Sequence, residues 1–83
     1  MNVLIGDIGN TNTKICLIEF HTFKIKKLIY FNSSNILSKN FLKRTLKKII
    51  KKETFIKTAL FSSVVPRYQL RLEKFFKKFY KIK

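Results

Sequence analysis

The chain has 83 residues and carries 19 lysines and arginines against 4 acidic residues, so its net charge is +15. That length allows one small domain with a limited core, and such a charge attracts polyanions. One cysteine and one histidine exclude an internal disulfide and a Cys/His metal site, and no apolar stretch approaches membrane-spanning length. Because no basic leader precedes the first apolar run, we expect a cytoplasmic protein without membrane insertion.

The N-terminal segment predicts two strands joined by a polar turn. Val3-Leu4-Ile5 is a short apolar run typical of a buried strand, and a second strand is expected over Lys14–Phe20. Between them, Gly9, Asn10 and Asn12 are residue types that accept positive φ, which predicts a turn with its backbone N–H groups in one concavity. Such a nest of amides binds phosphate oxygens without needing net charge.

Asp7 ends the first strand and is the only acidic residue before Glu19. One carboxylate beside an amide nest can hold Mg²⁺ or its waters against the phosphates of a nucleotide. The structural alternative is an Asx-rich turn that only closes a hairpin, with an aspartate that caps it. The residue types alone leave both interpretations open.

The next segment predicts a turn and an edge strand. His21-Thr22 turns the chain, and Phe23–Phe31 is expected to be a strand with one solvated face, because Phe23 and Ile25 alternate with Lys24 and Lys26. Lysines on a strand discourage further pairing, so this strand is expected at an edge of the sheet.

Two helices and a fourth strand complete the pattern. The Asn32–Asn35 segment is rich in capping residues and precedes a helix, and Phe55–Val65 is a strand followed by Pro66 in a first helical turn. Apolar stripes at helical spacing predict the buried faces of the two helices: Leu42, Leu46, Ile49 and Ile50 in the first, and Tyr68, Leu72, Phe75, Phe76 and Phe79 in the second. A cationic amphipathic helix can also lie on a membrane, but the preceding strand favours packing on the sheet.

The order is therefore β-β-β-α-β-α. A meander followed by a helical crossover places the fourth strand parallel to the first, in a mixed sheet of the α/β class. The fourth strand is apolar on both faces except at Lys57 and Thr58, which is typical of an interior strand.

Two motifs resemble one known family. Asp7-Ile8-Gly9-Asn10-Thr11-Asn12-Thr13 resembles the first phosphate motif of the actin-like sugar-kinase ATPases, in the spelling of the type III pantothenate kinases. Phe61-Ser62-Ser63-Val64-Val65-Pro66 resembles a strand-ending segment of the same family at a similar distance downstream. The resemblance implies a partial ribonuclease-H-like fold over residues 1–83, which would be the N-terminal subdomain of that family.

The resemblance also implies an activity, the ATP-dependent phosphorylation of pantothenate in coenzyme A synthesis. Asp7 would orient Mg²⁺, and the ATP phosphates would contact Ile8, Gly9, Asn10, Thr11, Asn12 and Thr13. From its position, we expect Lys14 to neutralise charge near the γ-phosphate. The family further uses a monovalent cation, K⁺ or NH₄⁺, and works as a homodimer.

Other family elements do not occur in the chain. The catalytic aspartate of the family lies in a Gly-x-Asp-Arg motif and a second phosphate motif follows it, so we expect a truncated product that is inactive alone. One alternative is a small basic module that binds nucleic acid or an anionic surface, although biased Lys, Ile, Asn and Phe usage also explains the charge. Another alternative is a regulatory relative that resembles the Bvg accessory factor.

Overall fold

The computed structural model describes residues 2–50 and 56–80, except for the side chains of residues 57, 79 and 80. The elements in chain order are three strands, a 3₁₀ helix, an α-helix, a fourth strand and a second α-helix: β1 (Asn2–Ile8), β2 (Asn12–Glu19), β3 (Lys24–Asn32), η1 (Ser33–Leu37), α1 (Lys39–Leu46), β4 (Ile56–Ser63) and α2 (Pro66–Tyr80). None of the described helices is long and apolar enough to cross a bilayer.

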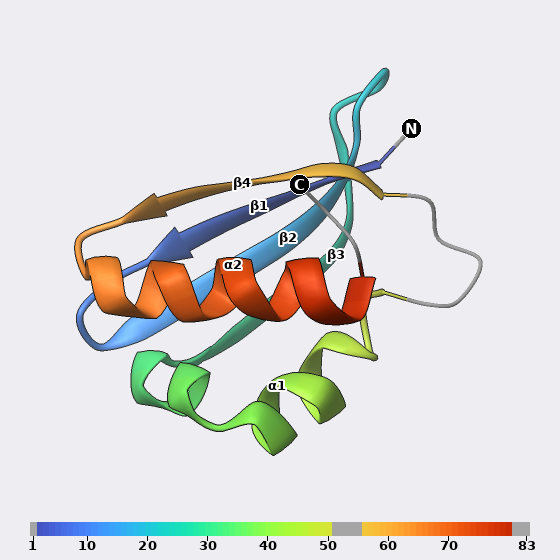
Figure 1. Ribbon diagram of the computed structural model, residues 1–83. Helices are drawn as coiled ribbons and strands as arrows, with labels where there is room; N and C mark the ends of the chain where they lie inside the picture. Colours follow the sequence, from blue (N-terminus) through green and yellow to red (C-terminus); the bar gives the residue numbers. More distant parts are fainter. Residues whose placement is uncertain (1, 51–55, 81–83) are drawn as a thin grey trace.

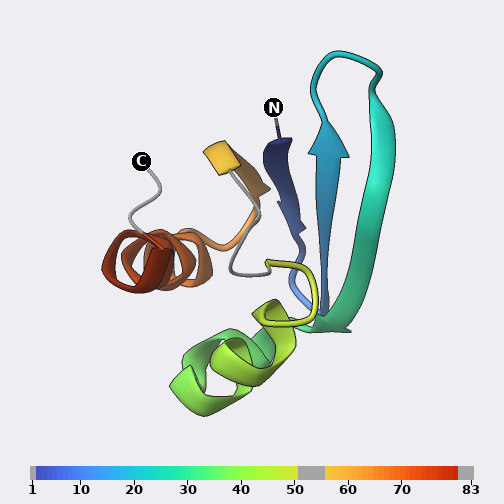
Figure 2. The ribbon, with the colours of Figure 1, turned by 90° about the vertical axis from the view of Figure 1, so that its right-hand side faces the viewer.

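The four strands form one mixed sheet in the order β3-β2-β1-β4. β2 is antiparallel to both β1 and β3, whereas β4 is parallel to β1, so the predicted α/β class and the predicted direction of the fourth strand are confirmed. The described helices all lie on one face of this sheet (Figures 1 and 2). No described helix covers the opposite face, which we call the outer face.

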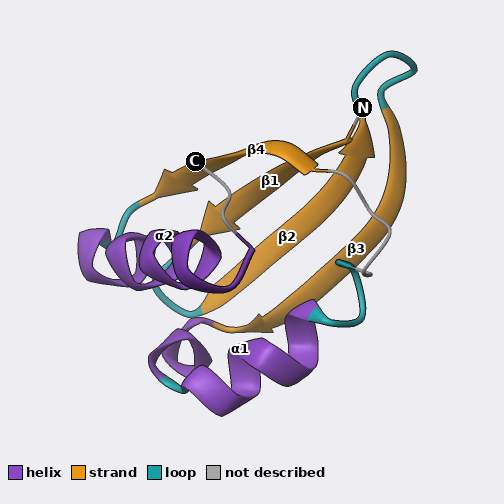
Figure 3. Cartoon of the chain, turned by 45° about the vertical axis from the view of Figure 1, so that its right-hand side comes forward, coloured by secondary structure: helices purple, strands orange, loops and turns teal. Residues whose placement is uncertain are grey.

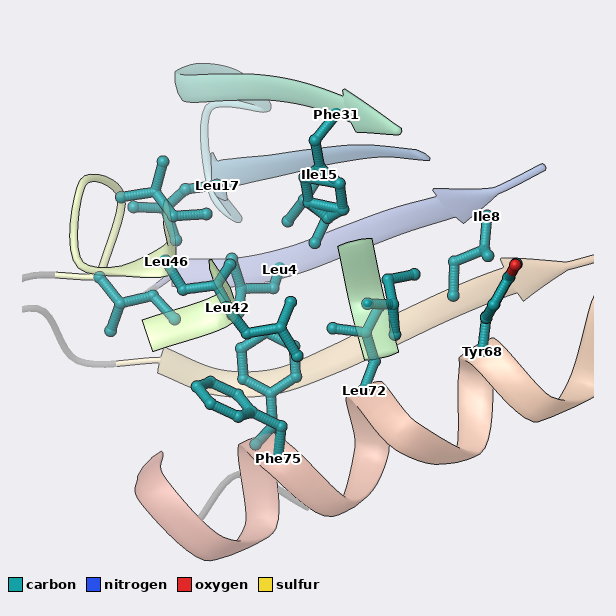
Figure 4. Packing of buried hydrophobic residues seen from close by; sticks show 14 residues of the cluster. Leu4, Ile8, Ile15, Leu17, Phe31, Leu42, Leu46, Tyr68, Leu72 and Phe75 are labelled. Carbon is teal, nitrogen blue, oxygen red and sulfur yellow. The ribbon is translucent and has the colours of Figure 1, made fainter. Parts of the chain in front are cut away.

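The core lies between the sheet and the helices (Figure 4). β1 contributes Leu4 and Ile8, which are nearly or fully buried, and the rings of Phe61 in β4 and Phe76 in α2 stack with centroids 5.6 Å apart. Both apolar helical stripes are buried as predicted, except that the side chain of Phe79 lies outside the described residues: Leu42, Leu46, Ile49, Ile50, Tyr68, Leu72, Phe75 and Phe76.

The first stripe extends beyond its helix. α1 ends at Leu46, but the N–H of Ile49 donates to the Leu46 carbonyl at 3.1 Å and the N–H of Lys48 donates to that of Thr45 at 3.2 Å. These i→i+3 bonds wind the chain through one more, tighter turn, so Ile49 and Ile50 still reach the core.

The prediction for the third strand was wrong in two respects. Phe23 belongs to the turn and not to the strand: its φ is 56° and its side chain is 76% exposed. Residues 24–28 are exposed on both faces, not on one, because the β2–β3 hairpin extends past the helical layer (Figure 3). The predicted edge position of β3 is confirmed. Phe55, the predicted first residue of the fourth strand, lies outside the described residues.

Candidate phosphate-binding site

The carboxyl ends of the parallel strands β1 and β4 meet at one end of the sheet. The N–H of Val64, just after β4, donates to the Ile8 carbonyl at the end of β1 at 3.1 Å. The β1–β2 turn and the start of α2 lie at this same end (Figure 1). In α/β sheets, ligands bind outside the carboxyl ends of the strands, so this end is where a nucleotide site is expected.

A row of polar side chains crosses the outer face at this end. Asp7 is in register with Lys14 of β2 and Ser62 of β4, and Lys14 is in register with Tyr30 of β3. Ile8 is buried among the core residues, and successive strand residues point to opposite faces, so the exposed Asp7 carboxylate lies on the outer face. The Nζ of Lys14 lies 6.0 Å from the centroid of the Tyr30 ring. The carboxylate thus lies between strands that carry an ammonium group and a hydroxyl group.

The β1–β2 turn differs from the prediction in its backbone. Phe23 alone has a positive φ among the described residues, so Gly9, Asn10 and Asn12 do not use the left-handed conformation. The N–H of Gly9 donates to the Asn12 carbonyl at 3.0 Å, and this contact closes the turn with ordinary φ values.

Two amide groups of the turn are available to a ligand. Within the part of the chain that the structure describes, the N–H groups of Asn10 and Thr11 donate to no backbone or side-chain acceptor. Both residues are exposed. Adjacent unpaired amides in a turn are donors suited to phosphate oxygens.

Ser33 stabilises the β1–β2 turn through three hydrogen-bonding contacts. Its Oγ donates to the Gly9 carbonyl at 2.7 Å and lies 2.7 Å from the Thr13 Oγ1, and its N–H donates to the Thr11 carbonyl at 2.8 Å. Ser33 and Thr13 are completely buried. Sequence reasoning missed this role of Ser33 and assigned its segment to helix capping, which Asn32 performs by accepting from the N–H of Ser34 at 3.1 Å.

The predicted site residues therefore separate by position. The side chains of Ile8 and Thr13 are buried on the helix side, so only their backbone atoms are available to a ligand. Gly9, Asn10, Thr11 and Asn12 form the turn itself and are half-buried or exposed. Lys14 is half-buried and lies beside Asp7 on the outer face. Contact between these residues and ATP stays a prediction. Ser62, in register with Asp7, is the neighbour that the site prediction omitted.

Among the described residues, Asp7 is the carboxylate at this turn that could bind a metal ion. The described residues contain no group of three or more His, Cys, Asp and Glu side chains that could hold a metal. A lone carboxylate is compatible with Mg²⁺, because that ion keeps several waters and binds through one or two carboxylates together with substrate phosphates. The arrangement suits a metal that arrives with a nucleotide.

Comparisons with known proteins agree with the two motifs. The family model described as type III pantothenate kinase matches residues 3–83. A type III pantothenate kinase of Pelagibacter ubique (strain HTCC1062) is 40% identical over 81 residues, which cover 98% of this chain and 32% of that protein. The chain thus spans about a third of the length of this curated relative. Both findings show that the chain belongs to the type III pantothenate kinase family.

Proposed function

We propose that this chain supplies the ATP-phosphate-binding part of a type III pantothenate kinase, which phosphorylates pantothenate in coenzyme A synthesis. The observation that carries the proposal is the turn between β1 and β2, where the unpaired N–H groups of Asn10 and Thr11 lie next to the Asp7 strand end. In the same proposal, the meander and the parallel β4 form the first part of a ribonuclease-H-like fold.

Each residue of the turn has a distinct task in this proposal. The N–H groups of Asn10 and Thr11 donate to phosphate oxygens, and the ammonium of Lys14 offsets phosphate charge from the adjacent strand. The Asp7 carboxylate holds Mg²⁺ or its waters. Bound Mg²⁺ supplies charge neutralisation between the phosphate oxygens. Ser33 does not touch the nucleotide but holds the turn in position through the Gly9 carbonyl.

The described residues do not add a second carboxylate to the turn. Glu19 ends β2 at the far end of that strand, and Glu73 lies within α2. Glu53 lies outside the described residues. Since phosphoryl transfer also needs a group that orients the attacking hydroxyl, we propose that this chain alone binds ATP without catalysis. The K⁺ or NH₄⁺ ion and the homodimer stay predictions.

Titration calorimetry with Mg·ATP tests the proposal. We expect weak binding that requires Mg²⁺ and that falls about tenfold in Asp7→Asn, the loss that corresponds to about 1.4 kcal/mol of interaction. Glu73→Gln is the matched control, because it also removes one carboxylate but lies in α2. Equal affinity of the wild type and both variants for Mg·ATP would show that Asp7 does not contribute to the site.

The same titration distinguishes the proposed function from a basic binding module. Polyanion binding driven by the +15 charge falls steeply with added salt through counterion release. It also gains affinity in both variants, since each raises the net charge. Steep salt dependence with no need for Mg²⁺ would favour the nucleic-acid interpretation instead.

A further inference from the structure

Tyr30 is an exposed aromatic residue that does not contribute to the core. It lies on the edge strand β3, and its side chain is 68% exposed. Because the next residue, Phe31, is buried among the core residues, the Tyr30 ring lies on the outer face. Tyr30 is in register with Lys14, and Lys14 is in register with Asp7. The ring is therefore in the same row as the proposed metal ligand.

The Lys14 side chain has two neighbours that attract a cation. Residues opposite each other on antiparallel strands have Cβ atoms about 4.5–5.5 Å apart, so a lysine on the middle strand can reach either flanking side chain. One neighbour is the Asp7 carboxylate, and the other is the π-face of the Tyr30 ring. The Nζ of Lys14 lies 6.0 Å from the centroid of that ring. Neither Asp7 nor Lys14 forms an ion pair with another described residue, so the ammonium is directed to the ring and not to the carboxylate.

The direction of this ammonium decides whether the carboxylate can bind a metal ion. A lysine paired with Asp7 would donate N–H groups to the carboxylate oxygens and would cancel the negative charge that attracts Mg²⁺. On its other side, Asp7 is in register with Ser62, whose hydroxyl is neutral. In the described part of this row, Lys14 is therefore the cation that would block the carboxylate.

We infer that Tyr30 is a positioning residue that holds the Lys14 ammonium away from Asp7 and so keeps this carboxylate free for Mg²⁺. The consequence, metal binding at Asp7, rests on the proposed function, whereas the position of Lys14 is a property of the free protein. At an exposed site, attraction between a cation and an aromatic ring changes an equilibrium about two- to fivefold. The effect of Tyr30 is therefore modest, and it depends on the presence of Lys14.

NMR of the free protein tests the position of Lys14 without a nucleotide. In the wild type and in Tyr30→Phe, we expect nuclear Overhauser contacts between the Lys14 ε-methylene protons and the protons of the ring. In Tyr30→Leu, we expect contacts from Lys14 to the Asp7 β-methylene protons instead. A wild-type Lys14 without contact to the ring, or a Lys14 that stays away from Asp7 in Tyr30→Leu, would overturn the inference.

Titration calorimetry with Mg·ATP tests the consequence for the metal site. We expect the affinity to fall about two- to fivefold in Tyr30→Leu and to stay at the wild-type value in Tyr30→Phe, which keeps the ring. Phe23→Leu is the matched control, because it removes a ring that is 76% exposed just before β3, at the other end of that strand. An equal loss in Tyr30→Phe would assign the effect to the hydroxyl, and an equal loss in Phe23→Leu would assign it to the hairpin. Either result would contradict the inference.

A double variant separates positioning from a structural effect of Tyr30. In a Lys14→Met background there is no ammonium to hold, so Tyr30→Leu is expected to change the Mg·ATP affinity little. Circular dichroism confirms that each variant is folded before titration. An undiminished effect of Tyr30→Leu in that background would show that Tyr30 does not act through Lys14. Absence of Mg·ATP binding by the wild type would instead contradict the proposed function, and the NMR contacts would still decide whether Tyr30 holds Lys14.

Discussion

At the scale of single residues, the geometry of the phosphate turn depends on contacts between residues that are far apart in sequence. The hydroxyl of Ser33 bonds to the carbonyl of Gly9, which lies 24 positions earlier, and to Thr13, which lies 20 positions earlier. Spacing within the motif predicts which residues form the turn. It does not predict this brace, because a serine in a polar segment has the same local pattern whether it caps a helix or supports a neighbouring strand.

Removal of the brace is expected to loosen the turn. Ser33→Ala leaves the Gly9 carbonyl and the buried Thr13 hydroxyl without this partner, which costs about 1–3 kcal/mol of unfolding free energy. Ser34→Ala is the control, because Ser34 is exposed and its hydroxyl, among the described residues, donates to the Asn32 side chain. Urea denaturation of both variants measures the difference, and equal stability of the two would contradict the proposed brace.

Gly6 is required by the packing of an aromatic ring. A Cβ on Gly6 would lie 2.4 Å from the Cδ1 of Phe61, whose ring is stacked on Phe76. Gly6→Ala therefore forces the stack apart and is expected to destabilise the fold by about 1–3 kcal/mol. The double variant Gly6→Ala/Phe61→Leu is expected to recover part of that loss in a denaturant titration. Strictly additive effects would show that Gly6 does not act through Phe61.

At the scale of elements, local periodicity correctly predicted which helix residues are buried. It predicted the ends of the helices and strands only approximately. The stripe of Leu42, Leu46, Ile49 and Ile50 is buried as expected, although α1 ends at Leu46. The alternation in Phe23–Phe31 predicted a half-buried strand, but a strand is buried only where another element covers it. How far the β2–β3 hairpin extends past the helices depends on the tertiary structure. The local pattern of Phe23–Phe31 therefore could not predict it.

β4 is an open edge in the described chain. It pairs with β1 alone, and Leu60 is 58% exposed on the outer face. The side chain of Lys57, the charged residue of this strand, lies outside the described residues. An apolar edge strand is a template for another chain, and salt screens the +15 repulsion beyond about 8 Å at physiological ionic strength. We therefore expect self-association that increases with salt, measured by sedimentation velocity.

Variants at two leucines of nearly equal exposure distinguish pairing at the β4 edge from nonspecific hydrophobic association. Leu60→Lys places a charge on β4, whereas Leu70→Lys places it on α2, where the leucine is 59% exposed. We expect only Leu60→Lys to reduce self-association. A wild-type protein that sediments as a clean monomer at low and high salt would show that β4 is not an accessible edge.

At the scale of the whole molecule, only one sheet face is covered by described helices. The outer face carries apolar side chains beside the Asp7 row: Ile5 and Leu28 are 40% and 44% exposed. The α/β class and the parallel β4 were predictable, because parallel strands need a crossover connection and a helix between two strands usually supplies it. Whether an element covers each face of the sheet was not predictable, since continuous apolar strands indicate burial without identifying the element that buries them.

Catalysis is a property of the whole molecule. The described residues hold one carboxylate at the turn, and the chain corresponds to 32% of the length of its Pelagibacter relative. We expect no phosphorylation of pantothenate by the isolated chain, because most of the catalysis in phosphoryl transfer comes from positioning of both substrates. A coupled ATPase assay with and without pantothenate checks this. Pantothenate-dependent turnover in a contaminant-free preparation would contradict it.

The central claim is that the β1–β2 turn binds the phosphates of ATP through its backbone. Two-dimensional ¹H–¹⁵N NMR during a Mg·ATP titration tests it most directly, because each amide reports its own environment. We predict the largest saturable shifts at the N–H groups of Asn10 and Thr11, and their loss in Asp7→Asn. Shifts that instead spread over the lysine-rich helices α1 and α2, with the turn amides unchanged, would contradict the claim.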